Sequence, residues 1–429
     1  MSAGTVGLLQ AIGKQYPLLG LALMHHRTTR GQPLKFEDKP YLIELYKDFP
    51  KIDGADGMKA VQVGWSELLV QLVLERSGWG GRVAAYVLPT YQLRDRFVQQ
   101  RVDPVIGTVA AYRQKIHEGN SGSMRIKKFG KGSLMFLGSN TVNDFIEFSA
   151  DVLIVDEFDR CEQQNLSLAR DRLRASPYPQ MFRIGNPTFP NMGISRLYTE
   201  SDQRKWFFKC SHCGKRQAVD WFENVVERDD SGAWRFRDRK AFAGTARRVR
   251  PVCIKCHQPF ERISEGSAWV AAHPTRHRRG YHMSRMDVLS QPLESLFQEW
   301  VEAQGVTARI QAFYTSVLGI PYETEGSSVT SETLTRICTG DAIDWGGGDK
   351  YRDSMMIAGI DVGNLLNINV SIVDVDSYGN KTRRCVFVGT FQRFSELFDT
   401  LCRFHVKCCV IDARPEIRKA QELRDKCRK

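Results

Sequence analysis

The chain has 429 residues and a formal net charge of +12, and 42% of its residues are hydrophobic and 26% charged. The length exceeds what one hydrophobic core usually supports, so we expect two or three domains of ordinary globular composition. The sequence contains no run of about 18 apolar residues, which excludes a membrane-spanning helix and favours a soluble protein. The excess of positive charge favours a polyanionic partner such as nucleic acid.

The N-terminal half of the chain predicts a helical segment followed by an α/β domain. Residues 1–33 have apolar character without the basic-then-apolar order of a signal peptide, which favours an amphipathic helix. Residues 34–204 alternate between short β-rich apolar runs and helical stretches, which indicates a parallel sheet with helical crossovers. The runs that predict strands are 83–88, 134–137, 152–155 and 181–184.

A degenerate phosphate loop is the first chemical signal along the chain. Residues 58–67 partly match G-x-x-x-x-G-K-[ST], a pattern whose backbone amides and lysine bind phosphates and whose hydroxyl binds Mg²⁺. Gly64 and Ser66 fit, but Trp65 occupies the lysine position and Lys59 stands at the first position of the motif. A lysine at that place can still reach inward over the phosphates. The alternative is a glycine-containing turn before a surface helix.

An acidic pair follows the strand expected at residues 152–155. In ATP-hydrolysing sites such a pair holds Mg²⁺, here through Asp156, and polarises the attacking water, here through Glu157. The alternative is an acidic pair that only favours a helix dipole. Further on, residues 185–188 (Gly-Asn-Pro-Thr) end another strand, where a side chain either senses the γ-phosphate or simply forms a good turn.

Two cysteine pairs lie in residues 205–279, a segment that is rich in aromatic and basic residues. Each pair has the form C-x-x-C, and the four residues are Cys210, Cys213, Cys253 and Cys256. Four thiolates suit tetrahedral Zn²⁺, and no open ligand position or nearby general base is evident, so we expect a closed structural site in a small zinc-binding module. The alternative is four reduced cysteines without a ligand.

The rest of the chain predicts a helical segment with a linker, residues 280–353, and then a second domain, residues 354–429. In that domain we expect extended runs at 355–361, 368–375 and 384–388, a helix at 394–404 and a strand at 408–411. Asp361 and Asp412 each lie at one of these strands. They are either metal ligands or ordinary aspartates at strand ends.

The order of these motifs resembles that in the large terminase subunit of tailed phages, particularly its lambda-like branch. The run Gly359-Ile360-Asp361-Val362-Gly363 in the last domain belongs to the same pattern. That branch has its phosphate-loop lysine displaced to the start of the motif. The resemblance implies a P-loop (RecA/ASCE-like) ATPase domain at residues 34–204. The residues implied to bind ATP and Mg²⁺ are Lys59, Gly64, Ser66 and Asp156, and Glu157 is implied to be catalytic.

Two further features bear on the same resemblance. Residues 185–188 fall where the family has its coupling motif. Gln62 departs from the family, because relatives often have there an arginine that neutralises charge during hydrolysis. A neighbouring subunit is the alternative source of such an arginine.

The resemblance also implies that residues 354–429 form a partial ribonuclease H-like nuclease domain. In such domains carboxylates from neighbouring strands, here Asp361 and Asp412, hold two Mg²⁺ ions for phosphodiester cleavage. A third acidic ligand is expected on a later element. Because the sequence stops at Lys429, we expect a truncated domain with weak or no cutting unless Glu416 supplies that ligand.

The implied function is ATP-driven translocation of double-stranded DNA into a phage prohead in the host cytoplasm, with cutting of concatemeric DNA. The implied cofactors are ATP, Mg²⁺ and Zn²⁺. The implied partners are double-stranded DNA, a small terminase subunit, the portal protein and neighbouring copies in a ring, without a membrane.

Two other functions compete with this one. A helicase-like ATPase would need strand-separation motifs and a second RecA-like lobe, neither of which we find in the sequence. A zinc-dependent DNA-binding or scaffold protein would retain duplex binding while its degenerate loop no longer binds nucleotide.

Overall fold

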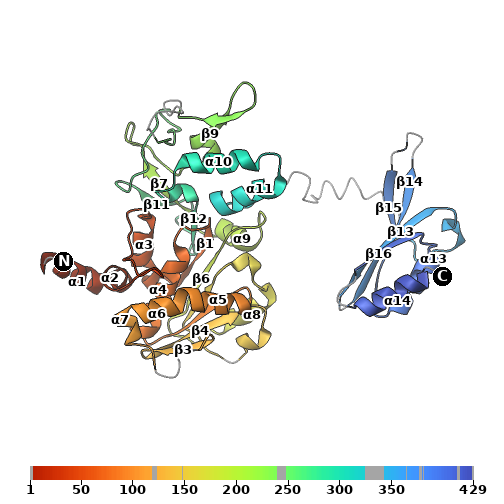
Figure 1. Cartoon of the computed structure of the whole chain (residues 1–429), viewed down its shortest axis with the longest axis horizontal. Helices are drawn as coiled ribbons and strands as arrows, with labels where there is room; N and C mark the ends of the chain where they lie inside the picture. The colour runs from red at the N-terminus through yellow and green to blue at the C-terminus, as the bar shows by residue number, and fades with distance from the viewer. Residues whose placement is uncertain are drawn as a thin grey trace. The chain divides into compact units, whose positions relative to one another are not determined.

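The computed structural model describes residues 3–117, 123–146, 148–238, 248–323, 343–363, 365–375, 379, 381–412 and 416–427. The chain divides into two compact units, Met1–Ser327 and Ser328–Lys429 (Figure 1). The division falls within residues 280–353, the segment that we expected to contain the linker. Among the described residues, no helix has the length and apolar character needed to cross a lipid bilayer.

The first unit is built on a ten-stranded sheet with the order β11-β7-β12-β1-β6-β5-β2-β4-β3, and β8 pairs with β7 outside this path. All neighbours from β7 to β4 are parallel, and the edge strands β11 and β3 are antiparallel to their partners. The strands are β1 (Gly54–Lys59), β2 (Val83–Leu88), β3 (Ile126–Phe129), β4 (Gly132–Gly138), β5 (Val152–Val155), β6 (Gln180–Gly185), β7 (Arg204–Lys209), β8 (Arg216–Gln217), β11 (Ala268–Ala271) and β12 (Arg279–Met283).

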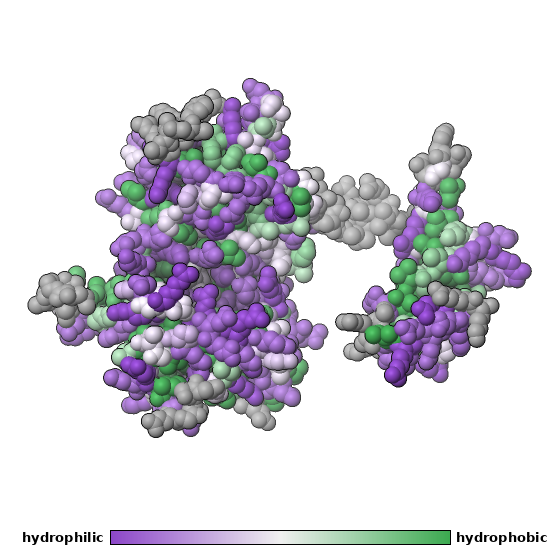
Figure 2. All heavy atoms as spheres, viewed as in Figure 1, coloured by the Kyte–Doolittle hydropathy of each residue, from purple (hydrophilic) through white to green (hydrophobic). Residues whose placement is uncertain are grey.

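Helices cover both faces of this sheet. The α-helices of the first unit are α1 (Ala3–Gln15), α2 (Pro17–Met24), α3 (Tyr41–Asp48), α4 (Trp65–Gly78), α5 (Tyr91–Phe97), α6 (Asp103–Thr108), α7 (Ala110–Arg113), α8 (Gln163–Asp171), α9 (Gly193–Glu200), α10 (Leu293–Ala303) and α11 (Thr307–Ala312). Alternate strand residues enter different apolar clusters: Tyr86 and Ile154 pack with α4 on one face, and Val87 and Val155 pack with α8 and α9 on the other. Figure 2 shows mainly hydrophilic residues on the visible face of this unit.

The four strands that the apolar runs predict are present as β2, β4, β5 and β6. The central strand β1 was not predicted, because its sequence GADGMK has neither an apolar run nor an alternating pattern. All six of its residues are nevertheless buried between β6 and β12. The charge of Asp56 is compensated there by Arg183 and Arg278, which each form two hydrogen bonds with its carboxylate.

The boundaries expected near Lys205 and Arg279 lie inside the first unit rather than between domains. The reason is that β7, β11 and β12 belong to the same sheet as β1, the strand that leads into the phosphate loop. These three strands lie within or at the edges of the expected zinc-binding module. Their aromatic side chains also share one core, since the ring of Trp269 packs edge-on against those of Trp206 and Tyr281. A second small sheet pairs β9 (Val226–Arg228) with β10 (Trp234–Phe236).

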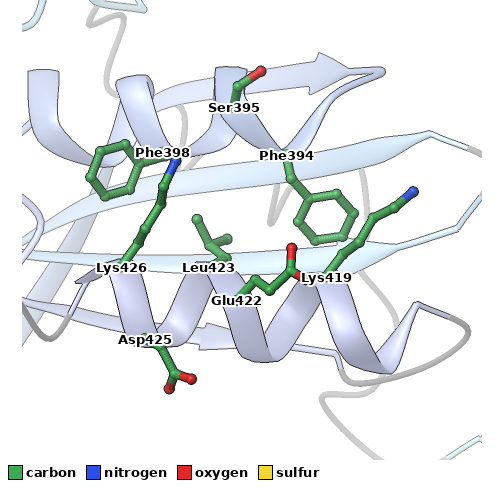
Figure 3. A pocket seen from close by; sticks show the side chains of 8 residues that line it. All are labelled: Phe394, Ser395, Phe398, Lys419, Glu422, Leu423, Asp425 and Lys426. Atoms are coloured by element: carbon green, nitrogen blue, oxygen red, sulfur yellow. The ribbon is translucent and has the colours of Figure 1, made fainter.

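The second unit contains a four-stranded sheet with the order β15-β14-β13-β16. Its elements are β13 (Met355–Val362), β14 (Leu366–Val375), β15 (Lys381–Phe391), α13 (Phe394–Arg403), β16 (Cys408–Ile411) and α14 (Ile417–Cys427). The first three strands form an antiparallel meander, and β16 returns parallel to β13 after the α13 crossover. Side chains of α13 and α14, among them Phe394, Phe398 and Leu423, line a cavity of about 550 Å³ (Figure 3).

Candidate nucleotide-binding site

The loop between β1 and α4 curls around the N-terminus of α4. Lys59 ends β1 and is 6% exposed. Gln62 and Gly64 have φ values of 62° and 93°, and Gly64 immediately precedes α4. A side chain at Gly64 would be strained by this φ, and its Cβ would lie 2.9 Å from Leu42 Cδ1. The loop therefore presents the free amides at the start of α4, an arrangement that suits phosphate.

Several hydrogen bonds fix this loop against the rest of the unit. The amide nitrogen of Ala60 donates to the Met283 carbonyl at 2.8 Å, and the amide nitrogen of Val61 donates to the Ser316 carbonyl at 3.0 Å. The Tyr41 hydroxyl donates to the carbonyl of Val63 at 2.9 Å. Because neighbouring elements satisfy these groups, the loop is preorganised without a ligand.

Trp65 occupies the position of the standard lysine but supplies no charge to the site. Its indole is 1% exposed and packs against the rings of Phe49 and Tyr281. Its Nε1 donates to the Met283 sulfur at 3.1 Å. The side chain is thus part of the core beneath the loop, and any lysine that serves the site must come from elsewhere.

The acidic pair meets the loop at the end of β5. Asp156 is 3% exposed and accepts hydrogen bonds from the Ser66 hydroxyl at 3.2 Å and the Tyr86 hydroxyl at 2.6 Å. Burial raises the pKa of the Asp156 carboxyl, and the nearby charge of Lys59 opposes this rise. The structure therefore places a hydroxyl and a carboxylate side by side, the two ligand types that hold Mg²⁺ in nucleotide-hydrolysing sites.

Glu157 lies beside Lys59, with 3.4 Å between the Lys59 Nζ and a Glu157 carboxylate oxygen. Its backbone has φ of 54°, a conformation that costs a non-glycine residue on the order of 1 kcal/mol or more. The amide nitrogen of Glu157 donates to the Asp156 carboxylate at 2.9 Å, which helps to hold this conformation. Its side chain is 31% exposed and can be reached by water.

A cavity of about 380 Å³ opens beside the loop. Its lining residues come from the loop, from the start of α4 and from two segments that the sequence did not associate with the site. These residues are Thr28, Leu34, Lys35, Lys39, Leu42, Tyr46, Lys59, Ala60, Gln62, Val63, Gly64, Trp65, Ser66, Glu67 and Arg101. No local motif marks residues 28–46, because only the tertiary fold brings them to the loop.

The turn after β6 connects the loop to the acidic pair. The Asn186 side-chain amide donates to the Lys59 carbonyl at 2.9 Å and to the Thr315 carbonyl at 3.2 Å. Thr188 donates from both its backbone nitrogen and its hydroxyl to Asp159, at 2.9 Å each. A displacement near Asp159 would therefore be transmitted to the segment predicted as the coupling motif.

The four predicted zinc ligands lie together, and all pairs of their sulfur atoms are within 4.8 Å. The Cys210–Cys256 and Cys213–Cys253 sulfur pairs are 3.8 and 3.7 Å apart. Tetrahedral Zn²⁺ with bonds of about 2.3 Å to sulfur requires sulfur separations of roughly 3.8 Å, so this arrangement fits the ion. Burial opposes ionisation of Cys253, but backbone N–H groups outweigh it and lower the pKa of this thiol to about 6.

In the second unit, Asp361 and Asp412 are exposed on adjacent parallel strand ends. The parallel register pairs Ile360 with Ile411, so the two aspartates occupy the next position on each strand. The Asp412 amide donates to the Ile360 carbonyl at 3.1 Å, and Asn367 donates to the Asp361 carboxylate at 3.3 Å. Within the described ranges neither belongs to a group of three metal-ligating side chains. Glu416 follows residues 413–415, which lie outside those ranges.

Comparison with known proteins assigns the chain to a family. The family model for the ATPase domain of the phage terminase large subunit gpA matches residues 32–269, which is more than half of the chain. No curated protein matches significantly.

Among solved structures, the large terminase of bacteriophage HK97 is 11% identical, with a TM-score of 0.43, over 94% of this chain and 74% of that chain. The large terminase ATPase domain of Thermus phage P74-26 is 11% identical, with a TM-score of 0.38, over 65% of this chain and 92% of that chain. Since the family model spans the phosphate loop, the acidic pair and both cysteine pairs, this chain belongs to the gpA family of phage terminase large subunits.

Proposed function

We propose that the first unit hydrolyses ATP and that this hydrolysis drives double-stranded DNA into a phage prohead. The observation that carries the proposal is the meeting of Lys59, Ser66, Asp156 and Glu157 around one preorganised loop. Family membership supports the ATPase activity, and the resemblance of the sequence motifs supports its use in packaging.

Each residue of this group has a chemical role in hydrolysis. The amides at the start of α4 and the Lys59 ammonium bind the phosphates. Ser66 and Asp156 would hold Mg²⁺, which would supply positive charge to offset the negative charge of the phosphates. Glu157 orients the attacking water, and in the absence of nucleotide its ion pair with Lys59 keeps both side chains at the loop.

The turn after β6 would couple hydrolysis to movement of DNA. Asn186 contacts the carbonyl of Lys59, and Thr188 contacts Asp159, two residues beyond Glu157. Loss of the γ-phosphate would shift Lys59 and Glu157, and these hydrogen bonds pass the shift to β6 and α9. The positive net charge of the chain favours contact with DNA phosphates.

The partners of the motor follow from the resemblance. We expect a small terminase subunit, the portal protein and further copies of this chain in a ring on the prohead, in the host cytoplasm. A neighbouring copy would supply the charge-neutralising arginine, because position 62 holds glutamine.

Zn²⁺ would act as a structural ion in the first unit. Cys210 and Cys213 follow β7, and Cys253 and Cys256 form the second knuckle, so the ion would join two segments that are distant in sequence. Four thiolates fill a tetrahedral shell, which leaves no position for a reacting water.

The second unit would carry a Mg²⁺-dependent endonuclease activity on a ribonuclease H-like fold. An antiparallel meander, a helical crossover and a parallel fourth strand support this assignment. Asp361 lies on β13 and Asp412 directly follows the neighbouring strand β16, which suits metal-dependent cleavage by carboxylates from adjacent strands.

A packaging assay tests the motor function. The full chain would be mixed with ATP, proheads, its small terminase subunit and duplex DNA, and the DNA protected from nuclease would be measured. We expect ATP-dependent protection with the wild-type chain and none with Glu157→Gln, whereas Glu302→Gln, an exposed change on α10, should behave as wild type. Equal protection of DNA by the wild type and by Glu157→Gln would overturn the proposal. A wild-type chain that binds duplex DNA but no nucleotide would favour the scaffold function.

A further inference from the structure

Lys39 lines the cavity beside the phosphate loop although no motif includes it. It stands two residues before α3 and lines the same cavity as Lys59 and Ser66. Its side chain packs on the phosphate loop: an added Cβ at Gly64 would lie 3.4 Å from Lys39 Cδ. The aliphatic stem of this lysine therefore lies against the glycine that precedes α4.

The charges of the cavity are strongly unbalanced. Four basic residues line it, Lys35, Lys39, Lys59 and Arg101, and the only acidic lining residue is Glu67. Glu67 is already hydrogen-bonded to the buried His26, and Lys59 pairs with Glu157, which does not line this cavity. Such a cavity suits a polyanion.

Lys39 differs from the other cations of the cavity. Lys35 and Arg101 are exposed, whereas Lys39 is half-buried. Within the described part of the chain, no ion pair joins Lys39 to a carboxylate. Burial lowers the pKa of Lys39, and the charges of Asp38 and Glu67 oppose this effect without cancelling it. A partly buried ammonium without a partner is costly, and an anion in the cavity would remove that cost.

The loop itself lacks the lysine that normally follows its last glycine. Trp65 holds that position and is buried in the core. Lys59 lies next to Glu157, the residue that we propose orients the attacking water, whereas Lys39 lies next to Gly64, where the amides of α4 begin. The two lysines thus lie at different parts of the phosphate loop.

We propose that Lys39 is a second phosphate-binding lysine, which contacts the inner phosphates of a nucleotide while Lys59 serves the γ-phosphate. The inference rests on the proposed ATPase function and adds a division of labour to it. A compact ammonium on a flexible stem can act as a point charge toward phosphate oxygens without fork-like geometry. ADP and ATP share the inner phosphates, so both nucleotides would need Lys39.

Nucleotide titration with the full chain tests this division. Fluorescent N-methylanthraniloyl ATP and ADP would be titrated at fixed Mg²⁺ and low salt. Lys39→Met keeps an unbranched apolar stem against Gly64 and Leu42 and removes the charge. We expect Lys39→Met to weaken both nucleotides by about ten-fold, corresponding to the loss of one charged phosphate contact. Lys39→Arg should restore affinity to within about three-fold of wild type.

Two comparison variants make the outcome specific. Lys128→Met removes an exposed cation of β3, which does not line this cavity, and should change either affinity by less than about two-fold. Lys59→Ala should weaken ATP more than ADP. A cooperative thermal unfolding transition establishes that each variant is folded. If Lys39→Met is not folded, the nucleotide affinity of Lys39→Arg tests the role of this position instead.

The outcomes separate this inference from the ATPase proposal. If the wild type binds neither nucleotide, both are overturned. If the wild type binds ATP and Lys59→Ala weakens it, but folded Lys39→Met binds both nucleotides like the wild type, only the role of Lys39 is overturned. Selective loss of ATP in Lys39→Met would likewise contradict a contact with the inner phosphates.

Discussion

The side-chain amide of Asn186 donates a hydrogen bond of 2.9 Å to the main-chain carbonyl of Lys59. It thereby ties the turn after β6 to the end of β1, where the phosphate loop begins. Through Thr188 the same turn is also tied to Asp159 in the segment that follows the acidic pair. A single turn is therefore hydrogen-bonded both to the start of the phosphate loop and to the segment after the acidic pair.

The first prediction concerns this turn. Asn186→Ala removes two hydrogen bonds but no group that we place on the nucleotide, so it should leave nucleotide affinity nearly unchanged and reduce the stimulation of ATP hydrolysis by duplex DNA. Coupling energies between sites imply a reduction of about five-fold or more. The comparison is between turnover with and without duplex, and Gln164→Ala, an exposed amide on α8, is the control. A variant that keeps full stimulation would show that coupling takes another route.

The second prediction concerns the cysteine cluster. The chain should bind one Zn²⁺, and removal of the ion with a chelator or by Cys256→Ser should lower the thermal unfolding temperature by several degrees or more, because metal binding contributes folding free energy. Elemental analysis and thermal denaturation measure the two effects. Cys402→Ser changes an exposed cysteine of the second unit and should alter neither. Purified protein with four reduced thiols and no metal would contradict the assignment.

The third prediction concerns the buried Asp56. Burial alone would raise its pKa, but the hydrogen bonds and charges of Arg278 and Arg183 outweigh burial and lower it. The folded pKa of Asp56 lies below its unfolded value. The ionised carboxylate with its two arginines therefore contributes stability above about pH 4, and this contribution is lost as the pH falls through the folded pKa. Asp56→Asn leaves two arginines without their partner and should cost about 3 kcal/mol at neutral pH.

Chemical denaturation measures the Asp56 effect at neutral pH and near pH 3. The difference between wild type and Asp56→Asn should shrink at the lower pH. Asp171→Asn, which breaks an exposed pair with Arg174, is the surface control and should cost less than about 1 kcal/mol. Equal costs for the two variants would show that the buried network does not stabilise the sheet.

The fourth prediction concerns Asp287, where burial raises the pKa to about 7 despite hydrogen bonds from Ser284. A folded pKa above the unfolded value gives stability that is complete below about pH 4 and is lost as the pH rises through 7. Burial lowers the pKa of His282 to about 3. Below the ordinary pKa of histidine this residue therefore reduces the stability of the folded state as the pH falls, which is opposite to the effect of Asp287.

Wild type and Asp287→Asn both contain His282. The difference between their free energies of unfolding therefore reports only on the ionisation of the Asp287 carboxyl. Between pH 5 and pH 8 the free energy of unfolding of the wild type should fall relative to that of the variant, by at most about 1.4 kcal/mol per pH unit. Denaturant titrations at both pH values measure it. A constant difference across this range would mean that Asp287 keeps one protonation state.

Much of the fold could be predicted, because continuous apolar runs mark buried parallel strands such as β2 and β5. Strand β1 could not, since its burial depends on the pairing of Asp56 with Arg183 and Arg278, which come from distant parts of the chain. The same limit applies to β7 and β12. Cysteine spacing marked a local module, but nothing in the spacing shows that its flanking strands join the central sheet.

The candidate site was predictable where chemistry requires residues close in sequence. The acidic pair and the loop glycine and serine follow from spacing alone, and the displaced lysine follows from the family resemblance. Tyr86, which hydrogen-bonds to Asp156, and Lys39, which packs on Gly64, carry no local signal. They reach the site only through strand order and through the packing of α3 against the loop.

The most direct test of the account is duplex-stimulated ATP turnover by the wild-type chain beside Glu157→Gln and Lys59→Ala, at fixed Mg²⁺ and low salt. The geometry predicts turnover by the wild type, a loss of about 100-fold or more in Glu157→Gln with ATP binding retained, and a loss of both binding and turnover in Lys59→Ala. If Glu157→Gln hydrolyses ATP as fast as the wild type, or if the wild type shows no turnover with its small subunit and duplex DNA present, the assignment of this loop and acidic pair as a working ATPase site is contradicted.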